Sequence, residues 1–479
     1  MTDTIPENSS FADAAQDLLG KRGFTCDPDL LEPWLTDWRG RYTGRALALA
    51  SPANTEEVAA LVKLCREHKV PIVPQGGNSG MVGGATPDKS GRELLLSLRR
   101  MSTIRMFEPG SQMITCEAGV VLQTLHETVE AKGLRFPLTL GGKGSATVGG
   151  LVSTNAGGTQ VLRHGTMRAQ VLGLEAVLAD GSILDTLTPL KKDNRGFDLK
   201  QLLIGSEGTL GIVTAATLRL LPQIGTRIVA WAGIDSILTA RRLLLHCEES
   251  ARNALEGFEV IPSHSLNAVL DHLPDARSPL AGEHAWHALI ELVSDRPNDT
   301  DLARMAEDVL ASALDKGLLE DATIAANETQ ADAFWLLRDS ISAAERAIGP
   351  AKQHDISVPV EKMADFVEEA IPTVKRRFPG CDAIAFGHLG DGNVHFHVLA
   401  PSGADRASWE AEDAKTISAF VYDLVTAWGG SISAEHGIGQ DKADTLRRLG
   451  DPVALGIMRK IKLALDPDGL LNPGKLLAG

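Results

Sequence analysis

Three of the chain's 13 histidines fall in one short segment, AIAFGHLGDGNVHFHVLA. The segment predicts a strand, a Gly-Asp-Gly turn and a second strand, a hairpin that would bring His388 and His395 together. His395 and His397 are two residues apart, so they should share one face of the strand. Imidazoles bind zinc and similar ions, and two histidines plus a carboxylate form a common catalytic metal site. A half-exposed strand face would also explain His395 and His397, and Asp391 suits the turn better than it suits a ligand.

Two further segments hold side chains that could act on a substrate. Glu435 and His436 adjoin in SAEHG, on an expected loop after Gly429-Gly430. Arg338, in FWLLRDSISAAER, could bind a carboxylate through two parallel hydrogen bonds. On residue types alone, Glu435-His436 is equally an ordinary polar loop pair, and an arginine on an amphipathic helix is usually a solvated residue.

Four glycine clusters lie in the first half of the chain. Glycine lets the backbone approach a ligand closely, and its N–H groups can cradle a pyrophosphate. One cluster alone would be a simple turn, but four in one domain favour a cofactor that carries phosphate. Neither GxGxxG nor GxxxxGK[ST] is present, which disfavours a Rossmann dehydrogenase and a P-loop NTPase. The clusters are Gly76–Gly84, Gly141–Gly150, Asn155–Gly158 and Gly205–Gly211.

Apolar periodicity predicts the elements that would position these residues. In the first half, a helix should begin after Asn54, and strands should cover 71–77 and 211–222. Residues 171–186 predict a hairpin with a tight primed turn at Asp180-Gly181. In the second half, strands and helices alternate, which indicates an α/β sandwich with a domain boundary near residue 222. There the expected strands are 227–234, 287–293 and 381–388, and the expected helices are 236–249, 301–317 and 413–430.

Composition narrows the class of protein. The 479 residues are 43% apolar and 23% charged, as in an ordinary globular protein of two or more domains. A net charge of −15 argues against a nucleic-acid partner, and no apolar run is long enough to span a membrane. The polar N-terminus lacks the features of a secretion signal, and five scattered cysteines suit reduced thiols, so a cytoplasmic location is expected. The polar segment 186–198 is expected to be a surface excursion.

Five motifs together resemble one family of flavoenzymes. They are PQGGNSGMVGG, LGGKGSATVGGLVSTNAGG, KKDNRGFDLKQLLIGSEGTLGIVT, FGHLGDGNVHFHV and SAEHGIGQDK. The chain resembles, from about residue 40 to its end, the group of D-2-hydroxyglutarate dehydrogenases, D-lactate dehydrogenases and glycolate oxidase subunits. These are FAD enzymes of the vanillyl-alcohol-oxidase type, and the likeness is greatest to D-2-hydroxyglutarate dehydrogenases.

The resemblance implies an α+β fold. It has a two-lobed FAD-binding domain over residues 1–222 and an α/β substrate and metal-binding cap domain over 223–460. Residues 461–479 would return to the FAD domain. Residues 74–84 contain neither His nor Cys, so FAD should be bound without a covalent link. The implied FAD contacts are Pro74, Gln75, Gly76, Gly77, Asn78, Ser79, Gly80, Met81, Gly141, Gly144, Ser145, Gly149, Gly150, Asn155, Gly157, Gly158, Glu207, Gly211, Ile212 and Asn472.

The resemblance also assigns the chemistry. His388, His395 and Glu435 would bind a divalent metal, zinc in the first place, with manganese or iron as alternatives, and His436 would be the catalytic base. The implied substrate contacts are Arg338, Ser342, Lys352, Asn393 and His397. Two positions depart from the family's pattern. Either Lys352 or Gln353 occupies the family's lysine position, and His397 stands where close relatives often have Asn.

The expected function is therefore FAD-dependent, metal-assisted oxidation of a D-2-hydroxy acid to a 2-keto acid, with D-2-hydroxyglutarate as first choice. D-lactate, D-malate and glycolate are alternative substrates within the family. An electron-transfer flavoprotein or a quinone would accept the electrons, and a homodimer is allowed. A metal-dependent hydrolase is the alternative of a different class, and a flavin-fold subunit without turnover is a further one.

Overall fold

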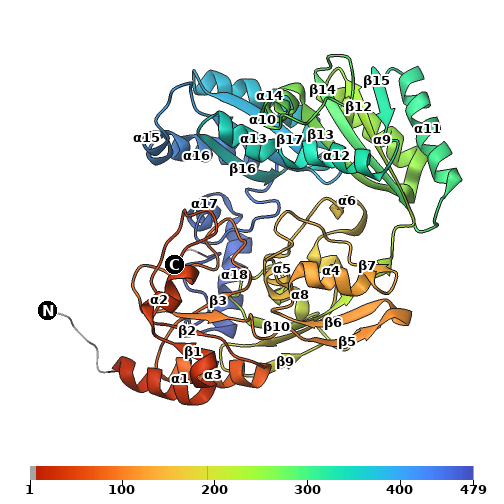
Figure 1. The fold of residues 1–479 in the computed structure, drawn as a ribbon. Helices are drawn as coiled ribbons and strands as arrows, with labels where there is room; N and C mark the ends of the chain where they lie inside the picture. The colour runs from red at the N-terminus through yellow and green to blue at the C-terminus, as the bar shows by residue number, and fades with distance from the viewer. Residues whose placement is uncertain (1–6, 191, 478–479) are drawn as a thin grey trace. The chain divides into compact units, whose positions relative to one another are not determined.

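A computed structural model describes residues 7–190 and 192–477 of the chain (Figure 1). These residues form two compact units, each with its own sheets. The first unit comprises Met1–Gly158, Gly165–Pro222 and Glu435–Gly479, and the second comprises Thr159–His164 and Gln223–Ala434. The division after Pro222 lies where the sequence predicts a boundary. The return to the first unit begins at Glu435, whereas the sequence suggests residue 461.

A four-stranded sheet forms one lobe of the first unit, in the order β1-β2-β4-β3. Strands β2, β4 and β3 run parallel and are buried, which explains their continuous apolar sequences. Asn54 caps α3 by accepting a hydrogen bond from the Glu57 N–H, as the sequence predicts. The elements of this lobe are α1 (Glu7–Gly23), β1 (Phe24–Thr25), α2 (Pro28–Leu31), η1 (Glu32–Trp34), β2 (Ala48–Ala50), α3 (Thr55–Glu67), β3 (Ile72–Gln75) and β4 (Leu94–Ser97).

A five-stranded antiparallel sheet, in the order β5-β6-β10-β8-β9, forms the other lobe. Its strands are β5 (Ile104–Glu108), β6 (Met113–Glu117), β8 (Val171–Val177), β9 (Ile183–Asp185) and β10 (Ile212–Arg219). The remaining elements of this lobe are η2 (Pro109–Ser111), α4 (Leu122–Glu130), β7 (Leu134–Arg135), α5 (Val148–Thr154), α7 (Met167–Gln170), α8 (Lys200–Leu203) and β11 (Leu221–Pro222). The C-terminal α17 (Ala443–Leu449) and α18 (Pro452–Leu465) complete the unit, and Leu471 then pairs with Ile72 of β3.

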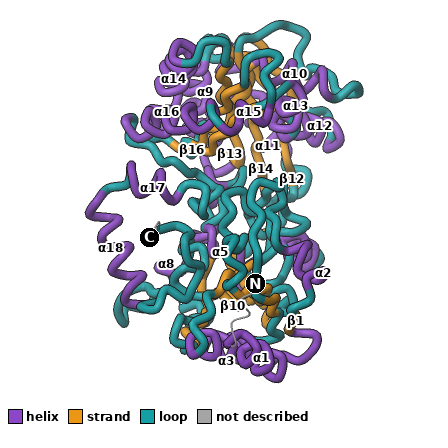
Figure 2. The backbone as a smooth tube through the Cα atoms, turned by 90° about the vertical axis from the view of Figure 1, so that its left-hand side faces the viewer, coloured by secondary structure: helices purple, strands orange, loops and turns teal. Residues whose placement is uncertain are grey.

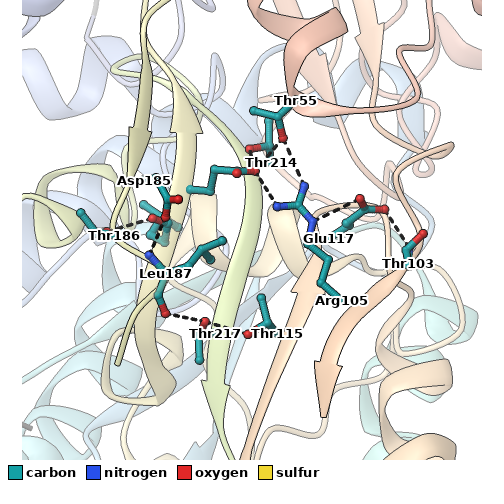
Figure 3. Close-up of polar contacts among 12 residues, drawn as sticks. Thr55, Thr103, Arg105, Thr115, Glu117, Asp185, Thr186, Leu187, Thr214 and Thr217 are labelled. Atoms are coloured by element: carbon teal, nitrogen blue, oxygen red, sulfur yellow. Dashed lines mark hydrogen bonds and ion pairs between the residues drawn. The ribbon is translucent and has the colours of Figure 1, made fainter. Parts of the chain in front are cut away.

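A buried polar network joins the two lobes (Figure 3). Arg105 of β5 forms ion pairs with Glu175 at 3.0 Å and with Glu117 at 3.3 Å. Glu175 also accepts hydrogen bonds from Thr55, at the start of α3, and from Thr214 of β10. Because every charge in this group has a partner, it links α3 to the five-stranded sheet without leaving a buried ion unpaired.

The turn between β8 and β9 and the segment 186–198 that follows were both predicted from the sequence. The β8–β9 hairpin exists, but the primed turn predicted at Asp180-Gly181 is wrong. Among these residues only Gly181 has a positive φ, and the turn closes from Leu178 to Ser182; a two-residue primed turn of type I′ needs two positive φ angles. The segment 186–198 contains no helix or strand in its described part, and its Phe197 is 95% exposed; Lys191 lies outside the described residues.

The second unit contains one seven-stranded antiparallel sheet, in the order β15-β12-β14-β13-β17-β18-β16. Helices cover both of its faces, with α9 and α14 on one side and α10, α12 and α13 on the other (Figure 2). The strands are β12 (Thr226–Ile234), β13 (Leu255–Pro262), β14 (Trp286–Ser294), β15 (Asp321–Ile324), β16 (Ala351–Ser357), β17 (Asp382–His388) and β18 (Asn393–Leu399). The other elements are α6 (Val161–His164), α9 (Ile237–Ala251), η3 (Arg252–Ala254), α10 (Ser263–His272), α11 (Thr300–Asp315), α12 (Glu328–Asp339), α13 (Ile341–Ile348), η4 (Val360–Lys362), α14 (Met363–Arg377), α15 (Arg406–Ala411) and α16 (Asp413–Ala427).

Candidate active site

The first glycine loop of the first unit leaves β3 and runs directly against the second. A Cβ on Gly77 would lie 1.7 Å from the carbonyl oxygen of Ser145, and one on Gly76 would lie 2.5 Å from Thr147 Oγ1. Only glycine fits at position 77, because the obstructing atom belongs to the backbone, whereas at Gly76 it is a side-chain oxygen. The first two glycine loops therefore lie in direct contact, as a cofactor site shared by both would require.

Several polar side chains of the predicted FAD segments hold the loops in place. Gln75 is buried and donates to the carbonyl oxygens of Trp34 and Ala85. Asn78, which has a φ of 51°, donates to the carbonyl oxygen of Thr36. These hydrogen bonds hold the loop that leaves β3 in place. Gln75 and Asn78 therefore have a structural role in addition to any contact with a ligand.

The end of the second glycine segment and the third segment are fixed in a similar way. Asn155 ends α5 with a φ of 50°, and its side chain accepts hydrogen bonds from Thr166 Oγ1 and the Arg168 N–H. A Cβ on Gly149 would lie 2.6 Å from Ala118 Cβ, and one on Gly158 would lie 2.2 Å from the Thr139 carbonyl oxygen. Tight packing thus explains why these positions are glycine.

Glu207 binds the loop that carries His436. Its two carboxylate oxygens accept hydrogen bonds from the Ile438 and Gly439 N–H groups, each at 2.7 Å. Burial raises the pKa of Glu207, which these two hydrogen bonds oppose. Asn472 donates to the Glu207 carbonyl oxygen, so the C-terminal segment adjoins the same loop.

The glycine loops fit a bound dinucleotide on two observations. Among the described residues, no heavy atom lies within 4 Å of a Cβ built on Gly80 or Gly141, so both face open space. Thr147 Oγ1 and Asn472 Oδ1 are buried, and neither atom has a hydrogen-bond partner in the described part of the chain. The remaining predicted FAD contacts lie in the same unit: Pro74, Ser79, Met81, Gly144, Ser145, Gly150, Gly157, Gly211 and Ile212.

The histidine hairpin of the second unit is formed by β17 and β18, as the sequence predicts. The rings of His388 and His395 lie with their centroids 5.7 Å apart. Register pairs His388 with Asn393, and Phe386 with His395. His395 and His397 share one face of β18, so the hairpin brings three imidazoles to the same side of the sheet.

Carboxylates surround His388. Its Nδ1 lies 3.3 Å from Asp391 Oδ2, and its Nε2 lies 3.4 Å from Glu259 Oε1. Burial lowers the pKa of His388, but Glu259 and Asp391 outweigh burial and raise it to about 9. Asp391 also accepts a hydrogen bond from the Asn393 N–H, so it both forms the turn and contacts the ring. Both carboxylates favour positive charge at His388, which suits a metal ion as much as a proton.

His395 has the opposite electrostatics. Burial and the positive charges of Arg338 and His388 lower its pKa well below the ordinary value. A neutral imidazole has a free lone pair, which is the form that binds a metal. The hairpin therefore places a neutral imidazole beside one whose neighbouring carboxylates stabilise a positive charge, and this donor set fits a divalent ion that displaces the proton of His388.

Arg338, at the end of α12, lies over the same sheet face. Its Nε donates to Glu259 Oε2 at 2.9 Å, and its Nη2 lies 2.9 Å from His388 Nε2. The side chain is 12% exposed, so Arg338 is not the solvated helix residue that its sequence context allows. A guanidinium fixed beside an imidazole can bind a carboxylate there.

A second group of polar residues lies further along β18. His397 Nδ1 forms a short contact with Glu345 of α13, which is fully buried and also accepts from Ser265 Oγ. Gln353 pairs with His397 across β16 and β18, and its Nε2 is buried with no partner among the described residues. Lys352 points to the opposite face because side chains alternate along a strand. Gln353, not Lys352, is thus on the face that carries the histidines.

The structure also locates the remaining predicted site residues, which are Asn393, Ser342, Glu435 and His436. Asn393 donates to Asp355 Oδ1 and to the Ile356 carbonyl oxygen, which ties the hairpin to β16. Ser342 is in the first turn of α13. The Ala434 N–H bonds to the carbonyl oxygen of Asp355, the register partner of His395. Glu435 and His436 follow directly in the chain, as the first residues that return to the first unit.

Sequence reasoning missed three features near the hairpin. Glu259 and Glu345 are buried acids that touch the predicted arginine and histidines. The segment of α6 packs on the hairpin, where a Cβ on Gly390 would lie 2.4 Å from Leu162 Cδ1. Arg163 of the same helix forms an ion pair with buried Glu256 at 2.7 Å. No local sequence pattern marks these contacts, since each joins segments far apart in the chain.

Two family matches cover most of the chain. Residues 46–187 match an FAD binding domain, and residues 226–476 match the C-terminal domain of FAD linked oxidases. The chain belongs to the FAD-linked oxidase family. The family resemblance inferred from the motifs is therefore confirmed, and so is the expectation of an FAD-linked oxidoreductase.

Curated relatives give the same result. The D-2-hydroxyglutarate dehydrogenase of Arabidopsis thaliana is 37% identical over 96% of this chain and 80% of its own length. That of Bos taurus is 38% identical over 94% of this chain and 80% of its own. A putative D-lactate dehydrogenase of Schizosaccharomyces pombe is 34% identical over 94% of this chain and 85% of its own.

All three relatives are named as mitochondrial proteins, so the cytoplasmic location predicted from the sequence is wrong. That prediction depended on reduced cysteines and on the lack of a secretion signal. Neither feature distinguishes the cytoplasm from the mitochondrion. No helix in the described residues is both long and apolar enough to cross a membrane.

Solved structures establish the fold. p-Cresol methylhydroxylase superimposes with a TM-score of 0.77 at 16% identity, covering 99% of this chain and 98% of its own. A 4-ethylphenol oxidase from Gulosibacter chungangensis gives a TM-score of 0.72 at 19% identity, covering 99% and 98%. The predicted α+β fold of the vanillyl-alcohol-oxidase type is confirmed.

Proposed function

We propose that this FAD-linked enzyme oxidises a D-2-hydroxy acid, first of all D-2-hydroxyglutarate, to the 2-keto acid with the help of a divalent metal ion. The observation that carries the proposal is the cluster of Arg338, His388 and His395 on one sheet face, with carboxylates beside it. A cation site and a carboxylate-binding guanidinium side by side match the two polar groups of a 2-hydroxy acid. The names of the curated relatives support the same substrate class.

The residues of the second unit would bind and orient the substrate. Arg338 would hold a substrate carboxylate in register, and such positioning can contribute several kcal/mol to catalysis, on the order of 7 or more in favourable cases. His388, His395 and Glu435 would hold the metal, which when bound acts as a Lewis acid that lowers the pKa of the substrate hydroxyl. Gln353, His397 and Asn393 lie beside or beyond this group on the same face, and we assign them to the distal part of the substrate.

His436 would accept the hydroxyl proton as the general base. Its loop is held by Glu207, which gives the imidazole a fixed backbone. FAD, when bound without a covalent link to the glycine loops, supplies the hydride acceptor chemistry. An electron-transfer flavoprotein or a quinone would then take the electrons from the enzyme. In domain terms, the first unit would bind FAD, and the second would supply Arg338, His388 and His395 to substrate and metal.

Anaerobic flavin reduction tests the proposal. The purified holoenzyme is mixed with D-2-hydroxyglutarate, D-lactate, D-malate, glycolate and the L-enantiomers, and bleaching of the flavin absorption band is followed. Bleaching by a D-acid, fastest with D-2-hydroxyglutarate, is the expected result. His436→Ala should keep its FAD and lose the bleaching. A holoenzyme that no 2-hydroxy acid reduces would overturn the proposed function.

A further inference from the structure

Glu259 is a buried carboxylate with two functional neighbours. It lies in β13, its register partner across the sheet is His388 of β17, and its side chain is 1% exposed. Oε2 accepts from Arg338 Nε at 2.9 Å, and Oε1 lies 3.4 Å from His388 Nε2. A buried carboxylate without partners is energetically costly. Any movement of Arg338 or His388 away from Glu259 would expose this cost, so Glu259 holds both side chains in place.

The geometry determines which edge of Arg338 can bind a substrate. A guanidinium binds a carboxylate in bidentate fashion along one edge, either Nε with one terminal nitrogen or both terminal nitrogens. Glu259 occupies Nε, so a substrate carboxylate would approach along the edge formed by Nη1 and Nη2, where Nη1 also lies 3.6 Å from Asp339 Oδ1. Arg338 Nη2 now lies 2.9 Å from His388 Nε2. A divalent ion held by His388 would replace the proton on this ring, and Nη2 could then turn to the substrate carboxylate.

We propose that Glu259 is a positioning residue, which holds Arg338 by Nε and lies beside His388 so that metal and substrate carboxylate are bound together. This inference rests on the proposed function, because it assigns Glu259 to the same site. The neighbours of Glu259 are Arg338 and His388, which would bind substrate and metal, so the loss of Glu259 should affect binding more than kcat. Loss of its negative charge should weaken metal binding. Loss of its hydrogen bond to Arg338 should make the guanidinium more mobile and raise KM.

A matched control is available in the same unit. Glu291 of β14 is also buried, and its Oε2 accepts from Arg227 Nε at 2.9 Å. It has no contact with the histidine hairpin in the described interactions; its other partner is Trp335 Nε1. Glu259→Gln and Glu291→Gln therefore remove the same charge from similar buried pairs, and only the first should alter the site.

The experiment measures zinc binding and steady-state kinetics of the FAD-loaded, full-length variants. For Glu259→Gln we expect a zinc Kd and a KM for D-2-hydroxyglutarate raised by about tenfold or more, a smaller change in kcat and an unchanged FAD content. Glu259→Asp should recover part of the zinc affinity. Glu291→Gln should keep the wild-type Kd and KM even if it unfolds at lower urea.

Two outcomes would overturn the role of Glu259. One is wild-type zinc affinity and KM in Glu259→Gln, and the other is an equal change in Glu291→Gln. If Glu259→Gln fails to fold, Glu259→Asp decides in the same way, since a shorter carboxylate should still raise KM more than kcat falls. Failure of the proposed function is distinguishable: the wild-type flavin would then not be reduced at all, whereas zinc titration would still report on Glu259.

Discussion

Leu162 packs directly on Gly390, in the turn between His388 and His395. A Cβ on Gly390 would lie 2.4 Å from Leu162 Cδ1 and 3.1 Å from Cδ2. Leu162 belongs to α6, which follows Gly158 after a short stretch of chain. The glycine segment proposed for FAD is thus covalently tied to a helix that packs on the hairpin proposed for the metal.

Gly390→Ala should lower the free energy of unfolding by about 1–3 kcal/mol, because the new methyl group overpacks against Leu162. In a Leu162→Ala background, the same substitution should cost much less, since the obstructing side chain is gone. Urea unfolding of the four proteins in this double-mutant cycle measures the difference. Equal costs in both backgrounds would show that the Leu162 contact does not constrain the turn.

The contact between the first two glycine loops can be tested at Gly77. An added Cβ would lie 1.7 Å from the Ser145 carbonyl oxygen, a backbone atom that cannot rotate away. Gly77→Ala should therefore separate the loops and lower the ratio of bound FAD to protein. Gly110→Ala is the control, because no heavy atom of the described chain lies within 4 Å of its Cβ. An unchanged flavin ratio in Gly77→Ala would exclude this loop from cofactor binding.

Local patterns predicted most of the elements that position the site. Helical periodicity after Asn54 gave α3, and alternation around a Gly-Asp-Gly turn gave the β17–β18 hairpin with His388 and His395 together. Such patterns depend on neighbours in sequence, which is why they are visible without the fold. The predicted type of the turn after β8 was wrong because Asp-Gly suits more than one turn type.

The partners of the site residues could not be predicted in this way. Glu259 lies in LEGFEVIP, which looks like any buried strand, and its role follows from register with His388. The choice between Lys352 and Gln353 likewise depends on which face of β16 meets β18. Both facts come from strand pairing across long stretches of chain, which no local spacing determines.

Glu207 offers a test of the loop that carries His436. In Glu207→Gln one oxygen still accepts a hydrogen bond, but an NH₂ group faces the other N–H, at a cost of about 1–3 kcal/mol. The Ile438–Gly439 backbone should shift, and flavin reduction should slow. Glu117→Gln removes another buried acid of the same unit that contacts the Thr103 N–H, and it should leave the reduction rate unchanged. Equal rates of flavin reduction in the two variants would show that Glu207 does not position the loop of the proposed base His436.

His287 of β14 should make stability depend on pH. Burial and the nearby His284 lower the pKa of His287 to about 4, below its ordinary value of 6.5. The unfolded chain therefore takes up a proton at a higher pH than the folded chain does. Stability should be complete above about pH 6.5 and decline as the pH falls toward about 4; a shift of this size corresponds to about 3 kcal/mol at most.

His287→Asn isolates this contribution. His287 Nδ1 accepts a hydrogen bond from Trp231 Nε1 at 3.1 Å, and the asparagine side chain offers an acceptor in a similar place without a titratable proton. Urea unfolding at about pH 7 and about pH 5 should show that wild type loses more stability than the variant on acidification. A stability difference that stays constant between the two pH values would mean that His287 is not held neutral by the fold. Every other titrating group is common to both proteins, so a change in the difference reports on the proton at residue 287 and on its interaction with His284.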